Sequence, residues 1–253
     1  MELSGKTAIV TGSAVGVGRA TALELAKRGA AIVVNYARSE ADAQETVGQV
    51  ERLGAKALLV RADVSRDDEV RAMVQRTLDA FGAVHVLVNN AATTSFVNFA
   101  DLEGLKEADW DRMLAVNLKG PFFCSRAVAG PMKAAGQGAI VNIVSIAGIR
   151  AIGSSIAYAA SKAGLINMTV ALARVLAPEV RVNAVAPGFI DTRWLRQGLG
   201  PLFDRVKQAT AEQTPLGRVS TPEDIARVVL SLIEDADFVT GQTITVDGGN
   251  SIR

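Results

Sequence analysis

The stretch TAIVTGSAVGVGRATALELA, residues 7–26, joins a short apolar run to a glycine-rich turn and then to a helical pattern. Gly12, Gly16 and Gly18 are spaced G-x-x-x-G-x-G in that turn. Glycines permit a tight turn and a close approach of a ligand to the backbone, and the amides that open the next helix attract a diphosphate. The strand, turn and helix together therefore predict nucleotide binding, since a turn built only for packing would need one or two glycines.

Strand and helix patterns alternate along the rest of the chain. Strands are expected over residues 6–11, 31–36, 56–61, 85–89, 139–145, 180–186 and 243–246. Helices are expected over residues 16–28, 40–53, 67–80, 109–131, 158–177 and 222–234. Several strands are almost continuously apolar, which is typical of parallel strands covered by helices on both faces. We predict an α/β fold: a single doubly wound Rossmann-type domain over residues 1–253, with a seven-stranded, mostly parallel sheet.

The ends of the expected helices carry recognisable signals. Three helical patterns end in a Gly-Ala pair, and these glycines suit the left-handed position just past a helix. Ser39 with Asp42, Ser65 with Asp68, and Thr221 with Asp224 predict capping boxes at three helix starts.

Composition excludes several classes of function. The net charge is +1, so nothing favours nucleic acid or an acidic membrane surface as a partner. Cys124 is the only cysteine, so no intramolecular disulfide can form, and a single histidine argues against a metal site. No apolar run approaches 18 residues and the first residues lack the layout of a signal peptide. We expect a cytoplasmic protein with no metal and no membrane partner.

Three polar positions suggest proton chemistry. Tyr158 and Lys162, in YAASK, are one helical turn apart, so an ammonium can lie beside a phenol. A nearby cation lowers the pKa of a phenol from about 10, which makes Tyr158 a candidate general acid or base. The other interpretation is a surface lysine beside an interfacial tyrosine. Ser145 ends an expected strand and is either a turn residue or a group that holds a substrate oxygen, and no G-x-S-x-G motif points to a serine hydrolase.

The order of these motifs is more specific than any one of them. TGSAVGVG is followed by AD at residues 62–63, NNA at 89–91, Asn117, Ser145, the Tyr158–Lys162 pair, NAVAPGFIDT and VTGQTITVDGG. Over essentially its full length the chain resembles the short-chain dehydrogenase/reductase family. That resemblance implies an NAD(P)(H)-dependent oxidoreductase that transfers a hydride between a nicotinamide and a carbonyl or secondary alcohol.

The resemblance also implies roles for matching positions. Tyr158 would exchange a proton with the substrate oxygen, Lys162 would lower the pKa of that tyrosine and bond the nicotinamide ribose, and Ser145 would orient the substrate oxygen. Asn117 would hold a water that extends the proton path. The expected cofactor-binding residues are Gly12, Ser13, Gly16, Val17, Gly18, Tyr36, Arg38, Ser39, Asp63, Val64, Asn89, Ala91, Tyr158, Lys162, Pro187, Gly188, Ile190 and Thr192. The chain departs from the family at Ala92, where glycine is usual.

The stretch NYARSE, residues 35–40, bears on the choice of cofactor. Tyr36 falls where NAD-preferring relatives carry an aspartate, so the carboxylate that would repel a 2′-phosphate is missing. Arg38 supplies a cation for that phosphate, and Ser39 begins the next helix. Val15 stands where many NADP-preferring relatives carry a basic residue. We therefore expect NADP(H) to be preferred, with NAD(H) possible.

The substrate is less constrained than the reaction. The overall likeness is to 3-oxoacyl-acyl-carrier-protein reductases, but the segment before the fifth strand lacks their basic residue, which leaves recognition of an acidic carrier protein open. The expected pocket residues are Thr93, Thr94, Ile146, Ile149, Arg150, Phe189, Trp194, Leu195 and Leu199, with a substrate lid around residues 189–218. They favour a moderately hydrophobic ketone or 3-oxoacyl substrate.

Other assignments stay open from the sequence alone. An NAD-dependent sugar or polyol dehydrogenase would share the same catalytic residues, and a non-enzymatic dinucleotide-sensing regulator would share the fold but would not need the serine, tyrosine and lysine together. Several helices are apolar on more than one face, and the family resemblance implies a homotetramer.

Overall fold

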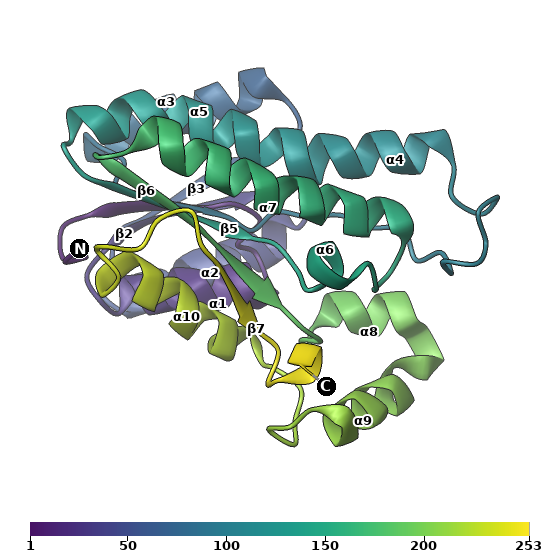
Figure 1. Cartoon of the computed structure of the whole chain (residues 1–253). Helices are drawn as coiled ribbons and strands as arrows, with labels where there is room; N and C mark the ends of the chain where they lie inside the picture. The colour runs from purple at the N-terminus through teal and green to yellow at the C-terminus, as the bar shows by residue number, and fades with distance from the viewer. Residues whose placement is uncertain (253) are drawn as a thin grey trace.

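The computed structural model describes residues 1–252 and contains a seven-stranded sheet in which every strand pairing is parallel (Figure 1). The strand order is β3-β2-β1-β4-β5-β6-β7. The strands are β1 (Thr7–Val10), β2 (Ala31–Tyr36), β3 (Ala57–Arg61), β4 (Val86–Asn89), β5 (Gly138–Ile143), β6 (Val180–Pro187) and β7 (Thr243–Val246). The predicted doubly wound sheet is confirmed, and its described strands are entirely rather than mostly parallel.

Helices cover both faces of the sheet (Figure 1). One layer holds α1 (Gly16–Ala26), α2 (Glu40–Arg52) and α10 (Pro222–Glu234), and the other holds α3 (Asp67–Phe81), α5 (Gly120–Ala134) and α7 (Ile156–Leu176). Successive residues of a strand point to opposite faces, so Val10 and Val34 enter the first core while Ile9 and Val33 enter the second. Because both faces are buried, the strands need to be apolar at every position.

The helix expected over residues 109–131 is longer and is interrupted. It comprises α4 (Glu107–Leu114), a π-helical turn η1 (Ala115–Lys119) and α5. Pro121 has no N–H, so the carbonyl of Asn117 loses the donor that a regular α-helix would supply four residues later. The amide of Gly120 bonds to the carbonyl of Ala115 instead, five residues back. The irregular turn therefore coincides with a residue that the sequence analysis singles out.

Short helices at the carboxyl edge of the sheet were not predicted. They are α6 (Ala147–Arg150), α8 (Arg193–Leu199), η2 (Gly200–Leu202) and α9 (Phe203–Gln213), with η3 (Asn250–Ile252) near the end of the chain. Figure 1 shows α8 and α9 outside the two main layers. Glycine and proline at residues 198–201 break the segment into pieces too short for a clear helical periodicity.

Only one of the three predicted capping boxes forms. The Thr221 hydroxyl accepts a hydrogen bond from the amide of Asp224 at 3.3 Å, and the Asp224 carboxylate accepts one from the amide of Thr221 at 2.9 Å. Ser39 precedes α2, but with a ψ of 69° its side chain makes no cap bond. The capping box predicted at Ser65 is also wrong, because α3 begins after Arg66 and the Ser65 hydroxyl donates to the Asp63 carboxylate instead.

Helix α7 is, by length and composition alone, the one helix of the described chain apolar enough to cross a membrane. Half of that stretch is buried inside the protein. Leu165, Leu172 and Leu176 are all buried in the two cores beside α7, so packing in this fold accounts for the apolar composition.

The capping difference gives a stability test. Thr221→Ala removes the hydroxyl that satisfies an amide at the start of α10, and we expect it to lower the free energy of unfolding by about 1 kcal/mol in urea denaturation. Ser39→Ala is the matched control, because that hydroxyl makes no cap bond, and its effect should stay within about 0.5 kcal/mol. An equal loss at both positions would contradict the assignment of the caps.

Candidate active site

A cavity of about 1130 Å³ lies at the carboxyl ends of the strands. Its walls include the turn between β1 and α1, the residues just past β2, β3, β4, β5 and β6, the start of α7, and α8. Ligands of open α/β sheets bind at this edge, and the crevice between β1 and β4 marks the point where the strand order reverses. The fold therefore brings the widely spaced sequence motifs to one place.

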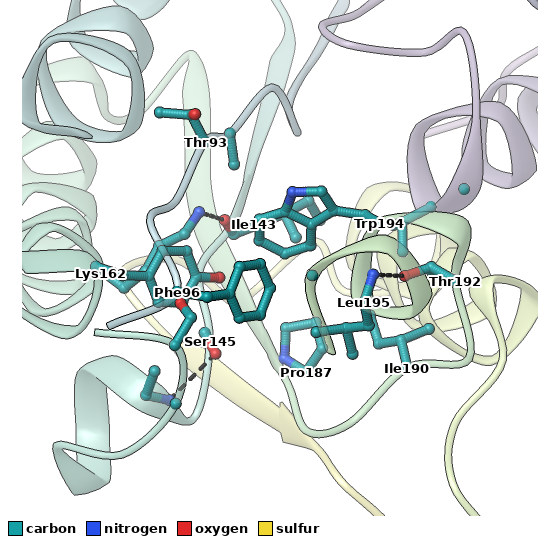
Figure 2. A pocket seen from close by; sticks show the side chains of 18 of the residues that line it. Thr93, Phe96, Ile143, Ser145, Lys162, Pro187, Ile190, Thr192, Trp194 and Leu195 are labelled. Carbon is teal, nitrogen blue, oxygen red and sulfur yellow. Dashed lines mark hydrogen bonds between the residues drawn. The ribbon is translucent and has the colours of Figure 1, made fainter. Parts of the chain in front are cut away.

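Ser145 and Lys162 lie on one side of this cavity (Figure 2), and Tyr158 lines it as well. Tyr158 and Lys162 lie one turn apart on α7, whose first turn is fixed by Ser155, since its hydroxyl accepts from the amide of Tyr158. Ser145 follows β5, and its Oγ accepts a hydrogen bond from the amide of Ala147 at 3.1 Å. The hydroxyl proton of Ser145 remains available to a neighbouring oxygen.

Burial controls the protonation of the phenol. It raises the pKa of Tyr158 to about 12, and a hydrogen bond with Ser145 acts in the opposite direction but is the smaller effect. Burial also lowers the pKa of Lys162 to about 8. The Lys162 ammonium donates to the carbonyl of Ile143 at 2.7 Å and lies 5.8 Å from the centre of the Tyr158 ring. Burial has the larger effect on the pKa of Tyr158 in this structure, and the expectation that Lys162 lowers that pKa stays a prediction.

Asn117 lies behind the cavity wall and is completely buried. Its side chain donates to the Thr93 carbonyl at 2.9 Å and to the Ser161 hydroxyl at 3.0 Å, and it accepts from the Thr93 amide at 2.8 Å. The carboxamide is thus fully used in holding the loop after β4 against α7. The sequence signal that was missed is Pro121, which removes the regular helical partner of the Asn117 carbonyl.

The glycines of the first turn have different structural roles. Gly12 and Gly16 both have positive φ, 61° and 59°, and both line the cavity. Gly18 does not line it: an added Cβ there would lie 2.5 Å from Nδ2 of Asn90 and 2.6 Å from the Gly12 carbonyl oxygen. Asn90 in turn donates to the carbonyls of Thr11 and Gly12, at 2.9 and 3.0 Å. Gly18 is therefore needed for the close approach of the turn to the end of β4.

Most of the expected cofactor residues do reach the cavity. Those that line it are Gly12, Gly16, Val17, Arg38, Asp63, Val64, Ala91, Tyr158, Lys162, Pro187, Gly188, Ile190 and Thr192. Those that do not are Ser13, Gly18, Tyr36, Ser39 and Asn89. The Tyr36 side chain packs into the first core, Ser13 accepts a hydrogen bond from the amide of Asn35, and Asn89 donates to Asn142. Their direct contact with a ligand is not supported by this arrangement.

Four cations line the cavity, and three of them have partners. Lys162 bonds a carbonyl, Arg112 pairs with Asp63 at 3.1 Å, and Arg193 pairs with Asp42. The Arg38 guanidinium makes no ion pair or hydrogen bond with any group in residues 1–252. Arg38 is therefore the cation that remains available to an anionic ligand at this end of the cavity.

The other end of the cavity is mostly apolar. The ring of Trp194, on α8, is 6.1 Å from that of Tyr158 and 6.4 Å from that of Phe96 (Figure 2). The expected residues that line it are Thr93, Ile146, Phe189, Trp194, Leu195 and Leu199, and the ones that were missed include Phe96, Phe99, Ile152, Leu202 and Val206.

Three expected pocket residues lie elsewhere. Arg150 donates to the carbonyl of Asn250 at 3.1 Å, Ile149 is half exposed on α6, and the Thr94 hydroxyl pairs with that of Ser154. Helix α6 turns Ile149 and Arg150 away from the cavity that Ile146 lines. Because the sequence showed no helix there, the direction of these side chains was missed.

Comparisons with known proteins agree with this arrangement. A family model described as enoyl-(acyl carrier protein) reductase matches residues 12–251. A ketoacyl reductase of the granaticin polyketide synthase of Streptomyces violaceoruber is 41% identical over 244 residues, covering 96% of this chain and 94% of its own length. A 3-oxoacyl-acyl-carrier-protein reductase of Staphylococcus epidermidis is 41% identical over 246 residues, covering 96% and 98%. A crystal structure of a short-chain dehydrogenase/reductase from Burkholderia xenovorans superposes with a TM-score of 0.92 at 32% identity, covering 98% of both chains.

The buried phenols give a direct test of the site electrostatics. The chain has two tyrosines, and burial raises the pKa of both Tyr36 and Tyr158 above 10, with the Glu40 carboxylate adding to the effect at Tyr36. Titration of the folded protein at 295 nm should therefore show no more than about half of the phenolate expected of two free tyrosines at pH 10. Tyr158→Phe should remove the later of the two ionisations. One full phenolate formed below pH 9.5, with the fold intact by circular dichroism, would show that a cation and not burial sets the pKa.

Proposed function

Because the chain belongs to the short-chain dehydrogenase/reductase family and is an oxidoreductase that acts on CH–OH or C=O groups, we propose that it is an NADPH-preferring reductase of a moderately hydrophobic ketone or 3-oxoacyl substrate. The observation that carries the proposal is the buried, protonated phenol of Tyr158, held with Ser145 and Lys162 in a cavity whose far end is apolar. The relatives that act on ketoacyl groups support the substrate class.

The residues present fit a nicotinamide dinucleotide. A Cβ at Gly16 would meet only the Thr192 methyl, at 3.9 Å, so the glycine leaves a gap between the first turn and the segment after β6. The start of α1 faces this gap, where a diphosphate is favoured. Asp63 and Val64 would border the adenine, and Pro187, Gly188 and Ile190 would lie against the nicotinamide.

Preference for the 2′-phosphorylated cofactor is supported by two features near the end of β2. The position of Tyr36 carries no carboxylate, and the Tyr36 side chain packs against the first core. Arg38 lines the cavity and is unpaired within residues 1–252, so binding a phosphate would not require breaking an existing ion pair. An arginine can form two parallel hydrogen bonds to a phosphate. Ser39 and the start of α2 follow Arg38 directly in the chain.

The proton chemistry follows from the pKa directions. When bound, the cofactor supplies the hydride that the carbonyl carbon accepts. Tyr158 donates its proton to the carbonyl oxygen as that oxygen gains negative charge, so the product is the alcohol. Tyr158 is protonated at neutral pH, as the proton donor of a reduction must be. Ser145 steadies the same oxygen through its hydroxyl, which is held in place by the amide of Ala147.

Lys162 and Asn117 would support the proton transfer from Tyr158. The Lys162 ammonium, anchored on the Ile143 carbonyl, lies beside the phenol ring and stabilises the phenolate that forms when the proton leaves. Asn117 would hold a water through its backbone carbonyl, because Pro121 lacks the N–H that would bond this carbonyl in a regular helix. That water would return a proton towards Lys162 and Tyr158.

The substrate end of the proposal rests on the segment of residues 189–218. We assign it as a lid, because α8 carries Trp194 and Leu195 over the cavity next to Tyr158. The apolar lining favours an acyl or hydrocarbon group over a sugar or polyol, whose hydroxyls would lack partners. We also propose a homotetramer, which the exposed Phe122 on α5 and Val175 on α7 support.

The role of the phenol can be tested against the second tyrosine. Tyr158→Phe removes only the hydroxyl, and we expect kcat for ketone reduction to fall by about 10²- to 10⁴-fold. NADPH binding, followed by fluorescence, should survive. Tyr36→Phe is the matched control and should retain activity, because Tyr36 does not line the cavity. Residual activity above a tenth of the original in Tyr158→Phe would refute the assignment.

The cofactor preference has its own test. Arg38→Ala should raise KM for NADPH by about 10- to 100-fold, as expected for the loss of a charged hydrogen bond, and should leave KM for NADH nearly unchanged. Arg52→Ala, at the far end of α2, keeps the same change of charge outside the cavity and should alter neither value. An unmodified enzyme at least as efficient with NADH as with NADPH would contradict the proposal.

A further inference from the structure

One ion pair at the edge of the cavity joins parts of the chain 151 residues apart. The Arg193 guanidinium, at the start of α8, donates to both oxygens of the Asp42 carboxylate at 3.2 and 2.7 Å. Asp42 lies in the first turn of α2. This is the only ion pair within residues 1–252 that joins α8 or α9 to a residue outside 189–218. It therefore links the substrate side of the site to the cofactor side.

The Asp42 end is firmly held. Arg19, in the first turns of α1, donates to the backbone carbonyl of Asp42 at 3.1 Å and to the Thr46 hydroxyl at 2.8 Å. The same guanidinium lies 4.0 Å from the Asp42 carboxylate. Asp42 is thus fixed to both helices whose N-termini face the proposed diphosphate and 2′-phosphate positions. The carboxylate is also the more buried partner of the pair, with 28% of its side chain exposed against 52% for Arg193.

The Arg193 end is placed by contacts on either side of it. Thr192 caps α8 through a hydrogen bond from the amide of Leu195. The next residue, Trp194, lies near Phe96 (Figure 2) and has its ring 6.1 Å from that of Tyr158. Further along, α8 runs so close to Phe96 that a Cβ at Gly198 would lie 2.0 Å from its ring. Helix α8 therefore rests on the substrate wall while Arg193 reaches the cofactor wall.

The pair lies beside the groove that the dinucleotide would occupy. Thr192, beside Arg193, faces the glycine turn across the Gly16 gap, and Arg38 precedes Asp42 by four residues on the opposite wall. Arg193 and Arg38 line the same cavity. We propose that Arg193 and Asp42 form a latch that closes over the bound dinucleotide and retards its release. The proposal rests on the proposed function for the position of the cofactor.

The two residues are positioning residues, since neither contacts the reacting atoms. The pairing lowers the pKa of Asp42 through the Arg193 guanidinium, so the pair stays charged throughout the neutral range. Salt weakens ion pairs that reach solvent, and both partners of this pair are partly exposed. Release of the cofactor from the unmodified protein should therefore become faster as the salt concentration rises.

The test is the dissociation rate of the reduced cofactor, measured by stopped-flow displacement. Asp42→Asn and Arg193→Gln should each speed release by about 3- to 5-fold, the value of a good partly exposed ion pair. The double variant should release no faster than the single ones, because both remove one interaction. KM for the cofactor should rise in proportion, and the salt dependence of release should flatten.

The chain provides a matched control in Asp204→Asn. That change removes the pair between Arg196 and Asp204, which lies wholly within the lid, and it should leave the release rate unaltered. Unchanged release in both Asp42→Asn and Arg193→Gln, additive effects in the double variant, or an equal effect of Asp204→Asn would each overturn the latch. Release is measured with whichever of NADPH and NADH binds more tightly, so a failed cofactor preference leaves this result interpretable.

Discussion

The contact between the first turn and the end of β4 is the constraint on which the working edge of the sheet depends. Asn90 bonds the carbonyls of Thr11 and Gly12, and the Thr11 hydroxyl accepts from the amides of Asn90 and Ala91. Only glycine at position 18 permits this approach. Because β1 and β4 flank the point where the strand order reverses, the contact holds the two halves of the cavity in register. Every functional side chain is then positioned relative to this junction.

The chemical centre shows how burial can decide between opposing electrostatic effects. A lysine beside a tyrosine suggests an easily ionised phenol, but burial of the phenol acts in the opposite direction. Here Tyr158 and Lys162 are both almost fully buried, so each is shifted towards its neutral form. The ammonium is stabilised by the Ile143 carbonyl rather than by phenolate. In the proposed reduction, Tyr158 would release its proton only as the substrate oxygen acquires charge.

The fold could be predicted well from the sequence because strands, helix ends and motifs leave local or periodic signals. The apolar strands, the Gly-Ala helix ends and the ordered motifs place β1 to β7 and the convergence of Ser145, Tyr158 and Lys162 within a residue or two. Errors arose where tertiary contacts decide. Ser65 bonds Asp63 instead of capping a helix, the Tyr36 phenol enters the core, and α6 turns Arg150 away. The pairing of Asp42 with Arg193 has no local signal, since 151 residues separate the partners.

The π-helical turn η1 has a further consequence for how this chain can vary in length. It holds one residue more per turn than the α-helix on either side, so it is equivalent to a single-residue insertion within a continuous helix. Deleting one residue between Leu114 and Gly120 would restore the regular α-helix and leave α4 and α5 in nearly their present relative orientation, because the wide turn already absorbs the extra residue. The change would be local, and it would disturb Asn117, which lies in this turn and is held between Thr93 and Ser161. The extra residue therefore serves the placement of Asn117 rather than the packing of α4 against α5.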